Sequence, residues 1–282
     1  MKYILILSLF ISSLFANNYT KAYDYLEEQE YKKAFKYFKL SAEEKNTSAM
    51  FYLGKMYDSG TFVNQDFKEA FRWYYKAAKG GHAKAQFYTG AMLDEGDGVA
   101  KSRVKALQWY KESAINENRE AQYNLALEYT NEKSKLYNAE EGLKLFFKSA
   151  NQGHVEAQHN LGMIYDNGAL GVDKDINMAI KWLSIAGYNG SSASSFNLGL
   201  IYANGTGIKQ NYTEAVKWYT LSAYKGYASA QRNLGLMYYK GQGVQKNIKE
   251  AYIWLLNASN QGNSGAKENL KYICNENPQI CK

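Results

Sequence analysis

Apolar positions recur along the chain at the spacing of amphipathic helices. In one stretch they include Ala49, Leu53 and Tyr57, each four residues apart, which places them on one face of an α-helix. A second stretch, with Ala70, Trp73 and Ala77, follows the same pattern. The single proline, Pro278, lies close to the end, so no proline interrupts these helices. The pattern predicts an all-α protein made of short amphipathic helices.

The two helix patterns alternate at a fixed interval. The central leucine of the first pattern returns every 36 residues, with one step of 37, at Leu53, Thr89, Leu125, Leu161, Leu198, Leu234 and Leu270. The aromatic position of the second pattern returns in phase with it, at Tyr37, Trp73, Trp109, Leu145, Trp182, Trp218 and Trp254. A fixed period of this size is typical of an α-solenoid, in which successive helix pairs stack on one another.

A glycine follows the central position inside most of the first helices. A glycine within a helix costs about 1 kcal/mol relative to alanine, so its repetition needs a repeated cause. We expect the second helix of each pair to approach closely there, with its tryptophan ring over the glycine. The positions are Gly54, Gly90, Gly162, Gly199 and Gly235.

The period divides the chain into six repeats between two caps. We expect the repeats to occupy residues 47–260, approximately at 47–82, 83–118, 119–154, 155–191, 192–227 and 228–263. Residues 17–46 form a diverged helix pair as an N-terminal cap, and residues 264–282 form a more polar helix with a terminal loop. The ends of a solenoid need such polar outer faces.

The first residues have the features of an export signal. Lys2 is followed by an apolar run from Ile4 to Phe15, and Ala16 is a small residue at a plausible cleavage point. We therefore expect residues 1–16 to be removed, which leaves a periplasmic or secreted chain without a membrane span. An uncleaved anchor is the alternative.

The two cysteines, Cys274 and Cys281, fit an oxidising compartment. We expect them to form a disulfide that holds the last helix, which would stabilise it by about 2–3 kcal/mol on the chain-entropy model. A redox role is not indicated, because the spacing differs from Cys-x-x-Cys.

Charge and histidine content exclude several functions. The net charge is +7 without a run of like charges, so a nucleic-acid partner is not expected. The histidines His82, His154 and His159 lack the spacing of a helical ligand pair. We expect neither a metal nor a cofactor.

The repeat pattern resembles that of the Sel-1-like repeat family, relatives of the tetratricopeptide repeats. Residues 230–238 match Ala-x-x-x-Leu-Gly-x-x-Tyr, residues 241–244 match Gly-x-Gly-Val, and residues 251–258 match the second-helix pattern. The resemblance covers residues 47–260. It implies a right-handed superhelix whose concave face holds a protein or peptide partner, and we expect the chain to be a monomer.

The first helices also carry apolar and amide positions that face away from the core. We expect those turned to the concave face, Phe51 among them, to form a peptide groove, although packing between neighbouring helices is the alternative at each position. The recurring asparagines could bind a peptide backbone or the adjacent repeat. The candidate binding residues are Tyr52, Tyr88, Tyr123, Asn124, His159, Asn160, Met163, Asn197, Arg232 and Asn233.

Two motifs leave room for other chemistry. Ser102 and Ser222 each begin a Ser-x-x-Lys match to a penicillin-site nucleophile, but the companion motifs are absent. A cysteine-rich secreted subgroup of the family is labelled β-lactamase, yet its paired cysteines are missing from these repeats. A β-lactamase-like or peptidoglycan-binding protein is the alternative to a scaffold, and a structural surface protein is a third.

Asn46 lies in an acidic sequon and is a possible glycosylation site.

Overall fold

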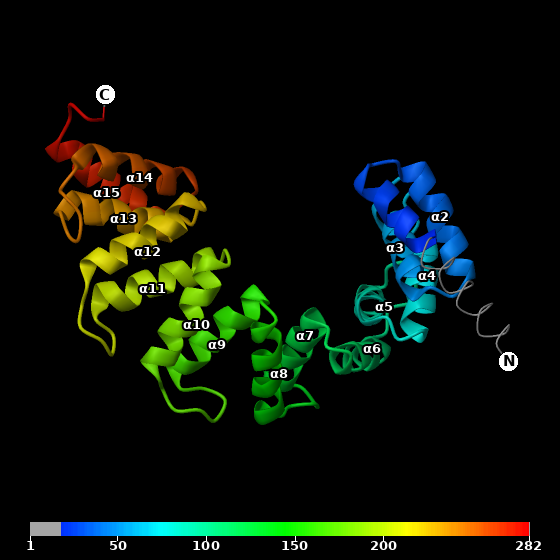
Figure 1. Ribbon diagram of the computed structural model, residues 1–282. Helices are drawn as coiled ribbons and strands as arrows, with labels where there is room; N and C mark the ends of the chain where they lie inside the picture. Colours follow the sequence, from blue (N-terminus) through cyan, green and yellow to red (C-terminus); the bar gives the residue numbers. More distant parts are fainter. Residues whose placement is uncertain (1–17, 282) are drawn as a thin grey trace, which may run out of the picture. The chain divides into compact units, whose positions relative to one another are not determined.

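The computed structural model describes residues 18–281, and all regular structure in them is helical (Figure 1). The expected signal segment, residues 1–16, lies outside this range. A helical stretch over residues 18–27 comes first. The later helices are α2 (Tyr31–Glu43), α3 (Thr47–Ser59), α4 (Phe67–Lys79), α5 (Ala83–Glu95), α6 (Arg103–Ile115), α7 (Arg119–Thr130), α8 (Ala139–Asn151), α9 (Val155–Asn167), α10 (Ile176–Tyr188), α11 (Ser192–Asn204), α12 (Tyr212–Tyr224), α13 (Ala228–Lys240), α14 (Ile248–Asn260) and α15 (Ser264–Glu276).

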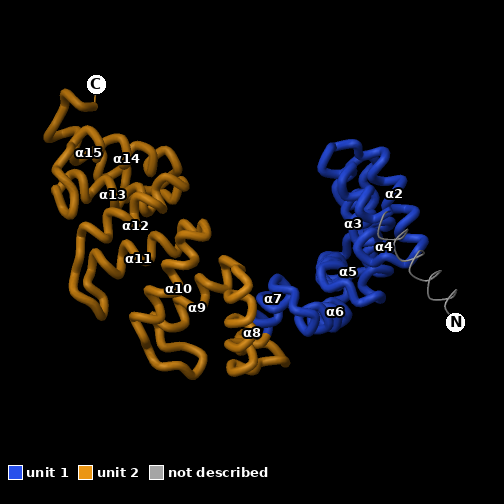
Figure 2. The backbone as a smooth tube through the Cα atoms, in the orientation of Figure 1, with its two compact units in different colours: residues 1–128 blue, residues 129–282 orange. Residues whose placement is uncertain are grey.

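The chain forms two compact units, residues 1–128 and residues 129–282, whose boundary falls within α7 (Figure 2). In the first unit each helix from α2 to α6 packs against the next. In the second unit the same holds from α8 to α15, and α11 also contacts both α9 and α13. Contacts between neighbours in sequence are those of an α-solenoid, which confirms the predicted fold class. We call the odd-numbered helices α3 to α15 the first helices and the even-numbered helices α2 to α14 the second helices.

Glycines close the turns between the helices of a pair. Gly60 ends α3 with a φ of 71°, and its amide donates to the carbonyl oxygen of Met56. Only glycine adopts this left-handed conformation without strain. In the next turn, Gly98 lies so close to the preceding repeat that a Cβ atom would come 2.1 Å from the carbonyl oxygen of Phe67. Glycine is therefore required there for space as well as for conformation.

The close approach expected at the helix glycines is present, but the tryptophan does not make it. A Cβ on Gly54 would lie 2.5 Å from Cδ1 of Tyr74, the residue that follows Trp73. The residue after the aromatic position makes the same contact in the other repeats, in the pairs Gly90–Tyr110, Gly162–Leu183, Gly199–Tyr219 and Gly235–Leu255. Trp73 instead packs against the core of α2 and α3, so the expectation of a tryptophan over the glycine was wrong.

Side chains cap the first helices. Asn46 accepts a hydrogen bond at Oδ1 from the amide of Ala49, at 2.8 Å. His82 occupies the equivalent position before α5, and its Nδ1 accepts from the amide of Ala85 at 3.1 Å. His154 does the same for α9. The repetition of the two histidines therefore has a structural cause, since each satisfies an amide that the helix leaves free.

A disulfide between Cys274 and Cys281, whose Cα atoms are 5.6 Å apart, lies at the C-terminal end of the last helix. The bond joins the last turn of α15 to the segment that follows it. The predicted staple on the terminal helix is thus present in the structure. Of the helices described, none is both long and apolar enough to span a membrane.

Candidate functional site

The ten predicted binding residues all lie on first helices and are all partly exposed. Tyr52 belongs to α3, Tyr88 to α5, and Tyr123 and Asn124 to α7. The others lie on α9 (His159, Asn160 and Met163), α11 (Asn197) and α13 (Arg232 and Asn233). Partial exposure fits both a binding surface and packing between repeats, so the contacts of each side chain matter.

Two of the three candidate tyrosines of the first unit, Tyr52 and Tyr88, stack on rings of their own chain. Tyr52 stacks on Phe38, with ring centroids 5.1 Å apart, and burial raises its pKa to about 12. Tyr88 stacks on Tyr74 at 5.0 Å. Phe51 lies between them and is only 6% exposed, so it belongs to the core and not to the expected groove.

Three of the four recurring asparagines have partners within the chain. Asn124 hydrogen bonds to Tyr110, and Asn233 makes the equivalent bond to Tyr219. Asn197 donates from Nδ2 to the sulfur of Met163, at 3.1 Å. These bonds connect a first helix to a neighbouring helix, which is the structural alternative weighed for this ladder.

The two basic residues among the candidates, His159 and Arg232, hydrogen bond to the following repeat. Nδ1 of His159 lies 2.8 Å from Oγ of Ser194, and burial lowers the pKa of the imidazole. Nε of Arg232 donates to Oδ1 of Asn269 at 3.0 Å. Both side chains therefore fix one first helix against the next.

A small pocket opens on the first helices of the second unit. It has a volume of about 270 Å³ and brings Asn233 together with apolar residues of α11 and α13. Leu200 and Leu236 occupy equivalent positions one repeat apart, and both are partly exposed. The pocket is lined by Leu200, Ala203, Asn204, Tyr212, Tyr219, Asn233, Leu236, Met237, Lys240 and Gln242.

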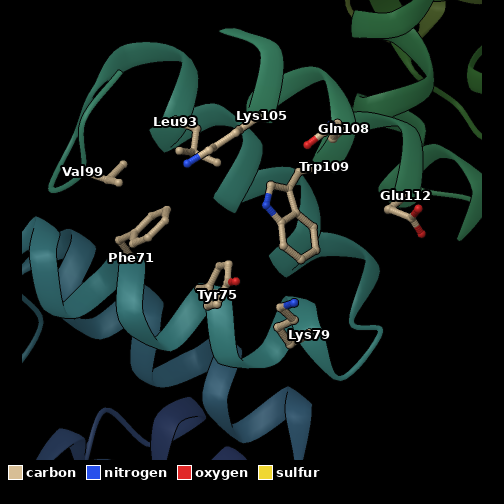
Figure 3. Close-up of a pocket in the computed structure, with 9 residues that line it drawn as sticks. All are labelled: Phe71, Tyr75, Lys79, Leu93, Val99, Lys105, Gln108, Trp109 and Glu112. Atoms are coloured by element: carbon tan, nitrogen blue, oxygen red, sulfur yellow. The ribbon is translucent and has the colours of Figure 1, made fainter. Parts of the chain in front are cut away.

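A larger pocket, of about 710 Å³, lies in the first unit between the second helices α4 and α6 (Figure 3). We call it the α4–α6 pocket. Aromatic side chains from both helices point into it, and charged side chains surround them. It is lined by Phe71, Tyr75, Lys79, Leu93, Val99, Lys105, Gln108, Trp109 and Glu112.

The α4–α6 pocket follows from the helical register. Phe71, Tyr75 and Lys79 are spaced by four residues, so they form one row along α4. This row lies next to the buried row that contains Tyr74. The ring of Tyr75 meets Trp109 of α6 edge-on, with centroids 5.7 Å apart, and Nζ of Lys79 lies 5.6 Å from the centroid of Tyr75.

Comparisons with known proteins assign the repeats. The family model described as Sel1 repeat matches seven segments, at residues 22–46, 47–82, 83–118, 119–154, 155–191, 192–227 and 228–263. The chain belongs to the Sel1 repeat family. The match at residues 22–46 adds one Sel1 repeat to the six expected from the sequence. Sel1 repeats are typical of scaffolds for protein–protein interaction, which agrees with the function class predicted.

Solved structures show the same fold. A protective antigen of uropathogenic Escherichia coli with the SLR fold is 32% identical, with a TM-score of 0.80 over 86% of this chain. This chain spans about half of that antigen, since the match covers 52% of it. A Sel1 repeat protein from Oxalobacter formigenes is 30% identical, with a TM-score of 0.73, and the match covers 86% of this chain and 96% of that protein. No curated protein matches the chain.

The two Ser-x-x-Lys motifs lie at different places in the Sel1 repeats. Ser222 is fully buried on α12, and its hydroxyl donates to the carbonyl oxygen of Ser192 at 2.8 Å. A buried hydroxyl in this bond cannot reach a substrate. Ser102 precedes α6 and makes no capping bond with its side chain, while Lys105 lines the α4–α6 pocket. Among the described residues no cluster of possible metal ligands occurs.

The α4–α6 pocket was missed from the sequence because its residues share the second helix with the repeat motif. Trp109 was assigned to the packing of the Sel1 repeats, and it does pack against the core that contains Tyr74. Its ring also has an accessible side, which the motif alone does not reveal. The available signal was the row Phe71, Tyr75 and Lys79, which lies beside the motif positions of α4.

Proposed function

We propose that this protein is an exported Sel1 scaffold that binds a protein or peptide partner through its first-helix face, the concave face of the expected superhelix. The observation that supports this best is the pocket between α11 and α13. It combines two partly exposed leucines, Leu200 and Leu236, with the amide of Asn233. A small pocket that combines leucine side chains with amide and hydroxyl groups is suited to one side chain of a peptide and its neighbouring backbone.

Repetition supports the same proposal. Leu200 and Leu236 occupy one position in successive repeats, so a peptide lying across α11 and α13 would meet similar groups at a regular interval. Of the ten predicted residues, Asn233 is the one that lines this pocket. We propose that the remaining nine contribute through the part of each side chain that stays exposed.

Export is supported by two features at opposite ends of the chain. Residues 1–16 have the composition of a signal segment. The disulfide Cys274–Cys281 is of the kind that persists in the periplasm or outside the cell. We propose that the mature protein acts in one of these compartments.

The proposal is tested by crosslinking and pull-down from the native envelope. The protein is compared with a variant that carries added negative charge on the first-helix face. In Leu200→Glu/Leu236→Glu, two carboxylates replace the apolar groups of the pocket, so a partner bound there should be lost. Ile253→Glu is the control, because Ile253 is 39% exposed on the second helix α14 and does not line the pocket. A partner retained by the double variant, or lost equally from both proteins, contradicts the proposal.

A further inference from the structure

We propose that the α4–α6 pocket is a second binding site, for a linear acidic peptide with one large apolar side chain. The apolar side chain would enter between Phe71, Tyr75 and Trp109, and its acidic neighbours would meet Lys79 and Lys105. This inference rests on the proposed function in one respect, that these repeats bind a protein. It concerns a different face and different residues.

The walls of the pocket favour an apolar anchor. Tyr75 is 38% exposed although its ring packs against Trp109 and Phe71, and Leu93, which also lines the pocket, is only 4% exposed. A volume of about 710 Å³ lies within the usual range of ligand sites, roughly 300–1,000 Å³. Burial of a leucine or aromatic side chain against aromatic walls of this kind favours binding.

The charges around the pocket favour acidic neighbours. Lys79 and Lys105 stand on opposite helices, and within residues 18–281 neither forms a salt bridge. Lys79 lies over the ring of Tyr75, so its ammonium group is held at the pocket wall. Glu112 is the one carboxylate of the lining, and its side chain points away from the aromatic rings in Figure 3. Two ammonium groups that lack a carboxylate partner within the described residues are complementary to a peptide with aspartate or glutamate next to its anchor.

The polar rim favours a peptide over a fatty acid. Lys79, Lys105, Gln108 and Glu112 are all exposed, so the pocket is bordered by water along both helices. A fatty acid would leave part of its chain in contact with this polar rim. A peptide can instead place its backbone there, since the amide of Gln108 both donates and accepts hydrogen bonds.

Selection of a phage-displayed random peptide library on the full-length mature protein tests the proposal. Enriched peptides should carry a large apolar residue flanked by aspartate or glutamate. Their Kd, measured by fluorescence anisotropy, should rise about tenfold or more in Lys79→Glu/Lys105→Glu, because like charges then face each other. Lys36→Glu/Lys68→Glu is the control: it makes the same change in net charge at exposed lysines of the first unit outside the pocket, and should change Kd less than about twofold.

The outcomes separate this proposal from the proposed function. Peptides that bind both double-lysine variants equally overturn the pocket assignment, as do enriched peptides without acidic residues, an absence of enrichment, or binding of laurate in place of peptides. If the enriched peptides instead lose binding in Leu200→Glu/Leu236→Glu, the first-helix site stands and the α4–α6 site fails. Loss in Lys79→Glu/Lys105→Glu alone supports the α4–α6 site.

Discussion

The ring of Tyr74 lies directly over Gly54, so close that a Cβ atom on the glycine would come within 2.5 Å of Cδ1 of the ring. Both residues are buried, and the corresponding pair recurs along the solenoid. This contact sets how closely the two helices of a Sel1 repeat approach each other. The glycine is therefore a requirement of packing, despite its cost within a helix.

We predict that Gly54→Ala destabilises the protein by about 1–3 kcal/mol, because the added methyl group overlaps a buried ring. Helix propensity alone predicts a gain of about 1 kcal/mol, so the two explanations differ in sign. The free energy of unfolding in urea distinguishes them. Ala126→Gly, at the equivalent buried position of α7, provides the reverse substitution and should also destabilise. A more stable Gly54→Ala protein contradicts the packing account.

The cap at Asn46 leads to a second prediction. Asn46→Ala should cost about 1 kcal/mol, because the amide of Ala49 loses its partner. Ser102 is the matched control, since it occupies the N-cap of α6 without a side-chain capping bond. Ser102→Ala should therefore cost less, measured as the shift in thermal midpoint. Equal shifts in the two variants would show that the capping bond contributes little.

His82 should make stability depend on pH. Its Nδ1 accepts a hydrogen bond from the amide of Ala85, and burial, with a smaller effect of Lys84, lowers the pKa of the imidazole below 6.5. A lowered folded-state pKa means that the unfolded chain binds the proton more readily. This contribution to stability is thus present above pH 6.5 and is lost as the pH falls through the folded-state pKa.

The control for His82 is supplied by the next repeat. Asn118 caps α7 from the equivalent position, with Oδ1 accepting from Ala121 at 2.8 Å. His82→Asn should therefore keep the cap and reduce the loss of stability in acid, seen as a smaller drop in thermal midpoint between pH 7 and pH 5. An unchanged pH profile in His82→Asn would exclude this histidine as a cause.

The disulfide should act locally. Cleavage of Cys274–Cys281 should speed amide hydrogen exchange in α15, because about 2–3 kcal/mol of loop-closure stabilisation is lost on the chain-entropy model. Exchange in α3 and α4 should stay the same, since each repeat contacts only its neighbours. Hydrogen exchange of Cys274→Ser/Cys281→Ser, followed by mass spectrometry, measures both regions. Faster exchange throughout the chain would show that α15 supports more than its own end.

The fold could be predicted from the sequence because the same pattern of residues recurs in every repeat. A single amphipathic helix does not identify a fold. The recurrence of the Leu53 position at Leu125 and Leu161 does, because it indicates a repeat. What the pattern leaves open is which neighbour a side chain meets. Trp73 and Tyr74 are adjacent in sequence and both aromatic, and only the rotation of α4 decides which of them covers Gly54.

The candidate sites could be predicted only in part for the same reason. The recurring asparagine position includes Asn233, which lines the pocket on α13, whereas helical phase selects Phe51, which is buried. The α4–α6 pocket depends on the space between Phe71 and Trp109, side chains of two different repeats. Such a space arises from the packing of two elements, and the pattern within either element does not contain it.

The most direct test of the account is photocrosslinking in native cells from the first-helix face. A benzophenone amino acid replaces Leu236 in one protein and Ile253 in another, and adducts are identified by mass spectrometry. Leu236 lines the pocket on α13, whereas Ile253 lies on α14 outside it. The account predicts a protein adduct, in the periplasm or outside the cell, from position 236 and not from position 253. No adduct from position 236, or the same adducts from both positions, would contradict it.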